Sequence, residues 1–142
     1  MRVLVPECGF EWEKFLHLNR SELFLSMGAA DFFDLAVVLA AERAGDDGFR
    51  CGTLLIWEEA AEAWLRRIAA EQVISCGFSP KNTLTPASTE SERIVITVQR
   101  EIRRPDGGYV WPQDVSLPKK WSKLPLQQQV MLTGLHLLGA EE

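Results

Sequence analysis

The chain has 142 residues, of which 46% are hydrophobic and 25% are charged, and its formal net charge is −5. This composition is typical of a soluble globular protein and excludes a disordered, collagen-like or disulfide-rich chain. The length fits one compact domain that spans residues 1–142. Three cysteines cannot all pair within one chain and indicate reduced thiols, so we expect a cytoplasmic protein. The longest apolar run, Leu35 to Ala41, is too short to cross a bilayer, and no contact with a membrane is expected.

The first elements are short. Residues 2–5 are apolar and are followed by Pro6, which predicts a strand. Residues 11–18 then carry Trp12, Phe15 and Leu16 at the spacing of one helix face, which indicates a short helix.

Residues 31–44 have the strongest helix signals in the chain. Asp31 is placed to cap the helix, Asp34 adds a negative charge to its first turn, and Gly45 follows its last residue. The segment is apolar almost all round, so we expect a helix that is buried in the core.

Residues 53–57 form an apolar run of strand length, and residues 58–72 predict a second helix. Glu58, Glu59 and Glu62 would lie in its first turn, where carboxylates favour the helix dipole. Residues 73–78 read as a further strand.

The clearest strand signal lies in residues 92–118. A strictly alternating run of β-branched residues leads into Pro105-Asp106-Gly107-Gly108 and out through Tyr109-Val110-Trp111. Such glycines accept a positive φ at little cost, and the flanking residues suit a half-buried pleated surface, so this segment predicts a β-hairpin. Alternation places Ile94, Ile96, Val98 and Ile102 on the buried face.

Residues 125–138 predict the last helix, because proline suits its first position and Gly139 follows its apolar run. Gly134 lies in the middle of this helix, which costs about 1 kcal/mol unless a close backbone approach compensates. That approach is either packing onto the sheet or a two-fold contact in a homodimer.

Together these elements predict an α+β fold. We expect a mainly antiparallel sheet that includes the 92–118 hairpin, with three to four helices packed on it: 31–44, 58–72, 125–138 and 11–18. In the alternative, the first half contributes parallel β-α-β pairing.

No residue set indicates a metal, a cofactor or a catalytic group. Cys8, Cys51 and Cys76 are far apart, whereas structural zinc sites present ligands in close pairs such as C-x-x-C. The pattern favours small buried thiols. Cys8 is the best candidate for a nucleophile, because it lies near a helix start and His17. The sequence contains no P-loop, nucleophile elbow, H-E-x-x-H motif or dinucleotide fingerprint.

One constellation of residues is suited to binding. Charge is uneven along the chain, since residues 1–48 sum to −5 (four basic, nine acidic) and residues 92–123 to +3 (seven basic, four acidic). Cations and aromatic rings gather in the second segment and can anchor a protein or contact phosphates and bases. The candidate binding residues are Arg100, Arg103, Arg104, Tyr109, Trp111, Lys119, Lys120 and Trp121.

Three functions follow as hypotheses. The leading one is a small non-enzymatic binding or adaptor protein, which recognises a protein partner, or a second copy of itself, through the 92–121 hairpin region and the C-terminal helix. It predicts an exposed apolar patch beside Tyr109 and Trp111. The alternatives are nucleic-acid binding by the basic hairpin, which the sequence pI of about 5.1 disfavours, and a small enzyme that uses a cysteine or a carboxylate in a cleft.

Overall fold

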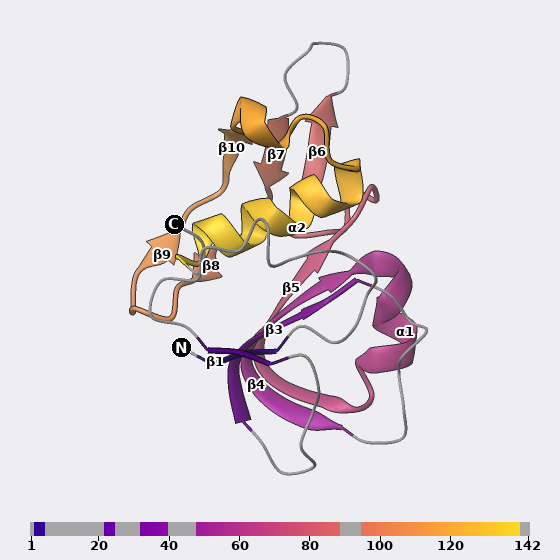
Figure 1. The fold of residues 1–142 in the computed structure, drawn as a ribbon, viewed down its shortest axis with the longest axis vertical. Coiled ribbons are helices and arrows are strands. Elements are labelled where there is room, and N and C mark those ends of the chain that lie inside the picture. Colours follow the sequence, from indigo (N-terminus) through magenta and orange to yellow (C-terminus); the bar gives the residue numbers. More distant parts are fainter. Residues whose placement is uncertain (1, 5–21, 25–31, 40–47, 89–94, 140–142) are drawn as a thin grey trace.

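The computed structural model describes residues 2–4, 22–24, 32–39, 48–88 and 95–139, to which all statements below refer (Figure 1). The strands are β1 Arg2–Leu4, β2 Glu22–Phe24, β3 Phe32–Val38, β4 Phe49–Trp57, β5 Ile68–Cys76, β6 Leu84–Ser88, β7 Val95–Val98, β8 Ile102–Arg103, β9 Tyr109–Val110 and β10 Gln113–Ser116. The helices are η2 Glu58–Ala60, α1 Ala61–Trp64, η3 Lys119–Trp121 and α2 Leu126–Leu137, where η denotes a 3₁₀ helix. Eight strands form one sheet in the order β10-β7-β6-β5-β4-β3-β1-β2, and β8 and β9 form a separate two-stranded ribbon. No helix in these ranges is both long and apolar enough to cross a membrane.

The first half of the sheet is parallel. β1 pairs with both β2 and β3, β3 with β4, and β4 with β5 in a register that runs from Phe49 opposite Ile68 to Trp57 opposite Cys76. Parallel strands with both faces covered are expected to be almost continuously apolar. Residues 54–57 are all buried, as this rule requires.

The second half is antiparallel. β6 joins the parallel strands through one register pair, Cys76 with Leu84. It then pairs antiparallel with β7, and β7 with β10. β7 and β10 are the two arms of the predicted hairpin, and the ribbon β8–β9 is its tip.

Two apolar layers cover the two faces of the sheet. On one face α2 packs against β4 and β6, and its residues 129–135 are all buried (Figure 1). The cluster on this face includes Leu55, Ile74 and Ile96. On the other face Trp64 of α1 packs with Leu54 and other buried side chains.

The prediction of a mainly antiparallel sheet with three to four helices was wrong. Six strands of the sheet, β1 to β6, take part in parallel pairs, and among the described residues only α1 and α2 are α-helices. The predicted helix 31–44 is strand β3 over its residues 32–38, while residues 40–44 lie outside the description. A strand buried on both faces is apolar all round, so its sequence resembles that of a buried helix.

The predicted helix 58–72 was also wrong over most of its length. Helical structure ends at Trp64, and residues 68–76 form β5. Leu65, which a helix over residues 58–72 would bury on one face with Ala61, Trp64 and Ile68, is 43% exposed. Pairing along the whole of β4 outweighs the helix propensity of this alanine- and glutamate-rich segment, since propensity is weak against tertiary contacts.

Other predictions were confirmed. Strands lie at residues 2–4 and 53–57, the hairpin arms pair antiparallel, and the last helix spans residues 126–137. Ile96, Val98 and Ile102 are buried, as alternation predicted. The alternative of parallel pairing in the first half was right about strand direction. The predicted helix 11–18 lies outside the described residues.

Candidate functional site

The tip of the hairpin is a tight turn that the sequence specifies. The amide of Gly107 donates to the carbonyl of Arg104 (3.0 Å), and the amide of Arg104 donates to the carbonyl of Gly108 (2.7 Å). Pro105 stands second in this turn, where its fixed φ is favourable. Gly107 has a φ of 92°, which only glycine adopts without strain. The predicted turn at residues 105–108 is therefore confirmed.

The ribbon β8–β9 has one apolar and one aromatic face. Ile102 and Val110 lie opposite each other and are buried in the cluster beneath α2. Tyr109 and Trp111 point the other way and are 52% and 63% exposed. Their rings stack with centroids 6.1 Å apart and planes at 25°. The two rings are thus exposed next to each other on one face of the ribbon.

One side chain fastens the ribbon to the sheet. The amide group of Gln72 on β5 pairs with the backbone of Arg103: the Arg103 N–H donates to Gln72 Oε1 (2.8 Å), and Gln72 Nε2 donates to the Arg103 carbonyl (3.0 Å). Nε2 also donates to Thr53 Oγ1 (3.2 Å). The Gln72 side chain thus satisfies the outer edge of β8 in the way a neighbouring strand would.

The outer edge of β9 has no such partner. Successive backbone groups of a strand point to alternate sides, and Arg104 bonds inward to Gly108, so Arg103 and Tyr109 form a pair whose N–H and C=O groups point outward. Those of Arg103 meet Gln72. Within the described ranges, no group pairs with the outward N–H and C=O of Tyr109.

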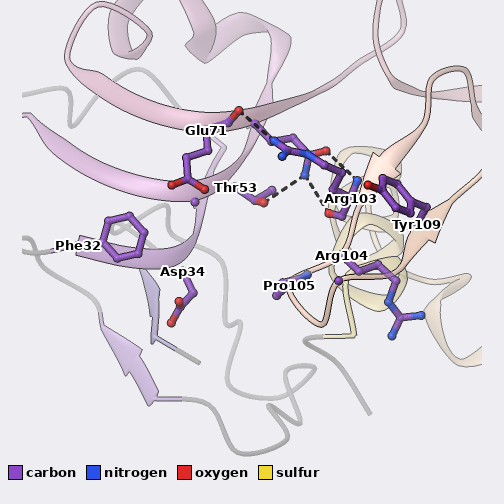
Figure 2. Close-up of a pocket in the computed structure, with 11 residues that line it drawn as sticks. Phe32, Asp34, Thr53, Glu71, Arg103, Arg104, Pro105 and Tyr109 are labelled. Atoms are coloured by element: carbon purple, nitrogen blue, oxygen red, sulfur yellow. Dashed lines mark hydrogen bonds between the residues drawn. The ribbon is translucent and has the colours of Figure 1, made fainter.

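A pocket of about 390 Å³ lies between this ribbon and strands β3 to β5 (Figure 2). Figure 2 shows Phe32, Asp34 and Glu71 on one side of it and Arg104, Pro105 and Tyr109 on the other. Its lining residues are Phe32, Asp34, Gly52, Thr53, Glu71, Gln72, Arg103, Arg104, Pro105, Gly107 and Tyr109. A second hollow of about 300 Å³ shares Phe32 and Glu71 with it and includes Arg50, Cys51, Ala69 and Ala70.

The charged groups of the pocket differ in the hydrogen bonds and ion pairs that they form. Asp34 Oδ2 accepts from the backbone N–H of Arg2 (2.6 Å), but no described residue donates to Asp34 Oδ1 or to the Glu71 carboxylate. The guanidinium of Arg103 donates to the Glu71 carbonyl (3.3 Å). Arg104 forms an ion pair with Asp106 (3.2 Å) and points away from the other side of the pocket (Figure 2). The pocket therefore offers carboxylate oxygens without donors. Each of its arginines has a contact within the protein, but the buried Nε of Arg104 has no hydrogen-bond partner among the described residues.

The predicted binding residues lie in different parts of the structure. Arg103, Arg104 and Tyr109 line the pocket, and Trp111 stacks beside them. Trp121 is only 2% exposed and belongs to the core under α2. The remaining cations lie apart from the pocket: Arg100 donates to Thr83 Oγ1 (3.3 Å), Lys119 is exposed on η3, and the side chain of Lys120 is outside the description.

Sequence reasoning missed the other half of the site. Phe32, Asp34, Glu71 and Gln72 lie on strands that had been predicted as helices. The one signal of Asp34, Glu71 and Gln72 was their polarity next to apolar residues, which on a strand marks a position that faces solvent or a cavity, and Phe32 gave no signal. Without knowledge of how β3, β4 and β5 pair, the sequence could not show that these residues lie close together.

The two described cysteines are poorly suited to catalysis. Burial, and to a smaller extent the charge of Glu71, raises the pKa of the Cys51 thiol to about 12. Burial also raises the pKa of Cys76. A nucleophilic thiol needs a lowered pKa. In the described part of the chain no three histidine, cysteine or acidic side chains gather as metal ligands, and Cys8 lies outside it.

Glu58 has a structural role at the carboxyl end of β4. Its carboxylate accepts from the Phe78 and Ser79 amides (3.2 and 3.3 Å) and from Asn82 Nδ2 (2.6 Å). Partial burial acts to raise the pKa of Glu58, but these hydrogen bonds outweigh it and lower the pKa below its ordinary value. Glu58 thus holds the loop after β5, rather than serving only the helix dipole.

No protein-family model, curated protein or solved structure matches this chain. Its function is therefore inferred from the ribbon and the pocket.

Proposed function

We propose that this protein is a non-enzymatic binding protein, which holds an extended segment of a protein partner along the outer edge of β9. The observation that carries the proposal is the exposed, stacked pair of Tyr109 and Trp111 beside the unpaired backbone of Tyr109.

The two rings are suited to anchor a partner. Tyrosine and tryptophan are among the side chains that most often dominate the binding energy of interfaces. Each buries a large area with few rotatable bonds. A rigid turn at Gly107 and the Gln72 contact to β8 hold the rings in place before binding, which lowers the entropy cost of association.

The open strand edge suits an extended chain. Addition of a strand to a sheet edge is a common mode of peptide recognition, in which main-chain hydrogen bonds give affinity and side-chain contacts give specificity. The Tyr109 N–H and C=O would supply one such pair of bonds, and the rings of Tyr109 and Trp111 would contact alternate side chains of the segment.

Nucleic-acid binding is the less favoured function. The guanidinium groups of Arg100, Arg103 and Arg104 donate to groups within the protein, and a net charge of −5 opposes phosphates. Affinity for mixed oligonucleotides that falls steeply as salt rises would favour it over protein binding.

The test compares the wild-type chain with Tyr109→Ser/Trp111→Ser in affinity capture from cells of the source organism, followed by titration of the purified partner. Loss of two anchor rings removes about 2 kcal/mol or more, so we expect at least a roughly 30-fold weaker affinity. The control is Leu65→Ser, which removes another exposed apolar side chain away from the ribbon.

Equal partner affinity of the double variant and the wild type would contradict the proposal. Hydrogen exchange adds a second readout, since the Tyr109 amide should become protected in the complex if it pairs with the segment. Analytical ultracentrifugation shows whether the captured segment belongs to a second copy of the chain.

A further inference from the structure

We infer that the pocket beside the ribbon receives a lysine or arginine side chain of the bound segment. This inference rests on the proposed function and assigns the chemical class of the partner.

Unused acceptors are the first argument. In the part of the chain that the structure describes, no donor reaches the Glu71 carboxylate or Asp34 Oδ1, although both residues line the pocket. Glu71 is exposed and Asp34 is partly buried, so the Glu71 carboxylate and Asp34 Oδ1 remain available to the donors of an incoming group. An ammonium or guanidinium group brings only donors, so it complements both oxygen groups at once.

The aromatic walls are the second argument. Phe32 is 41% exposed on the acidic side of the pocket, and Tyr109 is 52% exposed on the other side. The faces of aromatic rings carry partial negative charge and attract cations. Walls of carboxylates and rings favour an organic cation over an anion or a neutral group.

The arginines near the pocket do not reverse this preference. Arg2 donates through its guanidinium to the Phe32 carbonyl (2.8 Å) and lies over the Phe33 ring (5.2 Å). Arg103 donates to the Glu71 carbonyl, and Arg104 pairs with Asp106. Each of these guanidinium groups has a contact within the protein, although the buried Nε–H of Arg104 has no hydrogen-bond partner among the described residues. An anion in the pocket would also be repelled by the carboxylates of Asp34 and Glu71.

Tyr109 links the pocket to the strand edge. Its ring lines the pocket and also stacks on Trp111, so a segment that lies over this pair is next to the opening. A lysine or arginine side chain is long and flexible enough to reach inward from such a segment. A volume of about 390 Å³ accommodates that side chain together with water.

The experiment is a titration of the isotope-labelled protein with four blocked peptides, followed by amide NMR shifts. Each peptide has glycines around one central residue: lysine, arginine, norleucine or glutamate. We expect the lysine and arginine peptides to shift the amides of Gly52, Thr53, Glu71 and Gly107, and the other two to leave these amides unshifted. Norleucine has the length of lysine without the charge, so it isolates the ionic contribution.

A pair of matched variants completes the test. Glu71→Gln should weaken the lysine peptide about 5- to 10-fold, as expected for loss of a charge-assisted contact. Glu62→Gln removes the same charge from exposed α1, away from the pocket, and should change nothing. Thermal unfolding of both variants shows that the fold is retained.

Three results would overturn the inference: no shift with any peptide, equal shifts with norleucine or glutamate, or unchanged lysine affinity in Glu71→Gln. The two proposals fail separately. If Tyr109→Ser/Trp111→Ser loses the captured partner while Glu71→Gln keeps it, the pocket assignment fails and the binding function stands. If the aromatic variant keeps the partner, the proposed function itself is wrong.

Discussion

At the scale of single residues, close packing explains the glycine in the last helix. A Cβ atom on Gly134 would lie 2.7 and 2.9 Å from the two methyl carbons of Leu55 and 3.1 Å from one of Leu84. The close approach is therefore to the sheet within this chain. The helix gives up some intrinsic stability here so that its backbone can lie directly on β4 and β6.

Gly134→Ala should destabilise the protein by about 1–2 kcal/mol. Overpacking costs about 1–3 kcal/mol, and the better helix propensity of alanine returns up to about 1 kcal/mol of it. Urea denaturation measures the change. Gln128→Ala, on the same helix but outside the buried stretch, is the control and should lie within a few tenths of a kcal/mol of wild type. A stabilised Gly134→Ala would contradict the packing argument.

Glu58 predicts a pH dependence. Its folded-state pKa is lowered, so its contribution to stability is complete above the ordinary pKa of 4.5 and is lost as pH falls through the folded-state value. Glu58→Gln should therefore cost about 1 kcal/mol near pH 7, a figure discounted for partial exposure. The difference between wild type and variant should shrink at about pH 3.5. A difference in unfolding free energy that stays constant from neutral to acid would show that the charge of Glu58 is irrelevant.

At the scale of elements, Gln72 is one of the contacts that hold the ribbon on the sheet. Gln72 supplies both a donor and an acceptor to the same residue of β8, so its amide acts as a short piece of strand. The buried pair Ile102 and Val110 holds the opposite face of the ribbon. Removal of the amide should loosen the ribbon without unfolding the sheet.

Gln72→Leu should raise the hydrogen-exchange rate of the Arg103 amide and cost about 1–2 kcal/mol, because two backbone groups lose their partner. Gln113→Leu is the matched control, since Gln113 is exposed and its side chain bonds only to the carbonyl of Trp111 two residues away. Unchanged exchange at Arg103 would mean that the buried face alone positions the ribbon.

Local signals were enough to predict some elements and not others. The hairpin tip depends on Pro105, Gly107 and alternating residues close in sequence, and the last helix on its flanking Pro125 and Gly139, so both were predictable. β3 and β5 depend on pairing with strands elsewhere. Double-sided burial removed the period of two from the sequence of β3. β5 does alternate between exposed and less exposed residues, but its alanine, glutamate and glutamine residues favour a helix.

The same distinction applies to the site. Arg103, Arg104, Tyr109 and Trp111 belong to the hairpin and were found with it. Asp34 was predicted to lie in the first turn of a helix, so its position beside the ribbon could not be predicted from the sequence. Residues 32–34 and 71–72 come together with the ribbon only through the order of strands in the sheet.

At the scale of the whole molecule, a buried apolar cluster lies on each face of the sheet, and these two clusters protect the thiols. Cys51 belongs to the cluster on the α1 face and Cys76 to the cluster on the α2 face, so they lie on opposite sides of the sheet. Raised pKa values keep both protonated near neutral pH. Reaction with a thiol reagent therefore requires opening of the core.

In a Cys8→Ala variant, a chromogenic disulfide reagent near neutral pH should leave Cys51 and Cys76 unmodified in the native protein. Both should react after denaturation, at a rate that follows global unfolding as denaturant is raised. The denatured variant, which must give two thiols, is the control. Rapid native labelling of either cysteine would show that its side of the sheet opens locally.

The late position of α2 has a consequence for how the chain is made. β3, β4 and β5 leave the ribosome well before residues 126–137, which cover Leu55, Ile74 and their neighbours. Until then α2 does not cover one apolar face of these strands, and that face stays in contact with water. Newly synthesised chains therefore complete this layer only after residues 126–137 have emerged, and until then the exposed strands are suitable clients for chaperones that shield apolar segments.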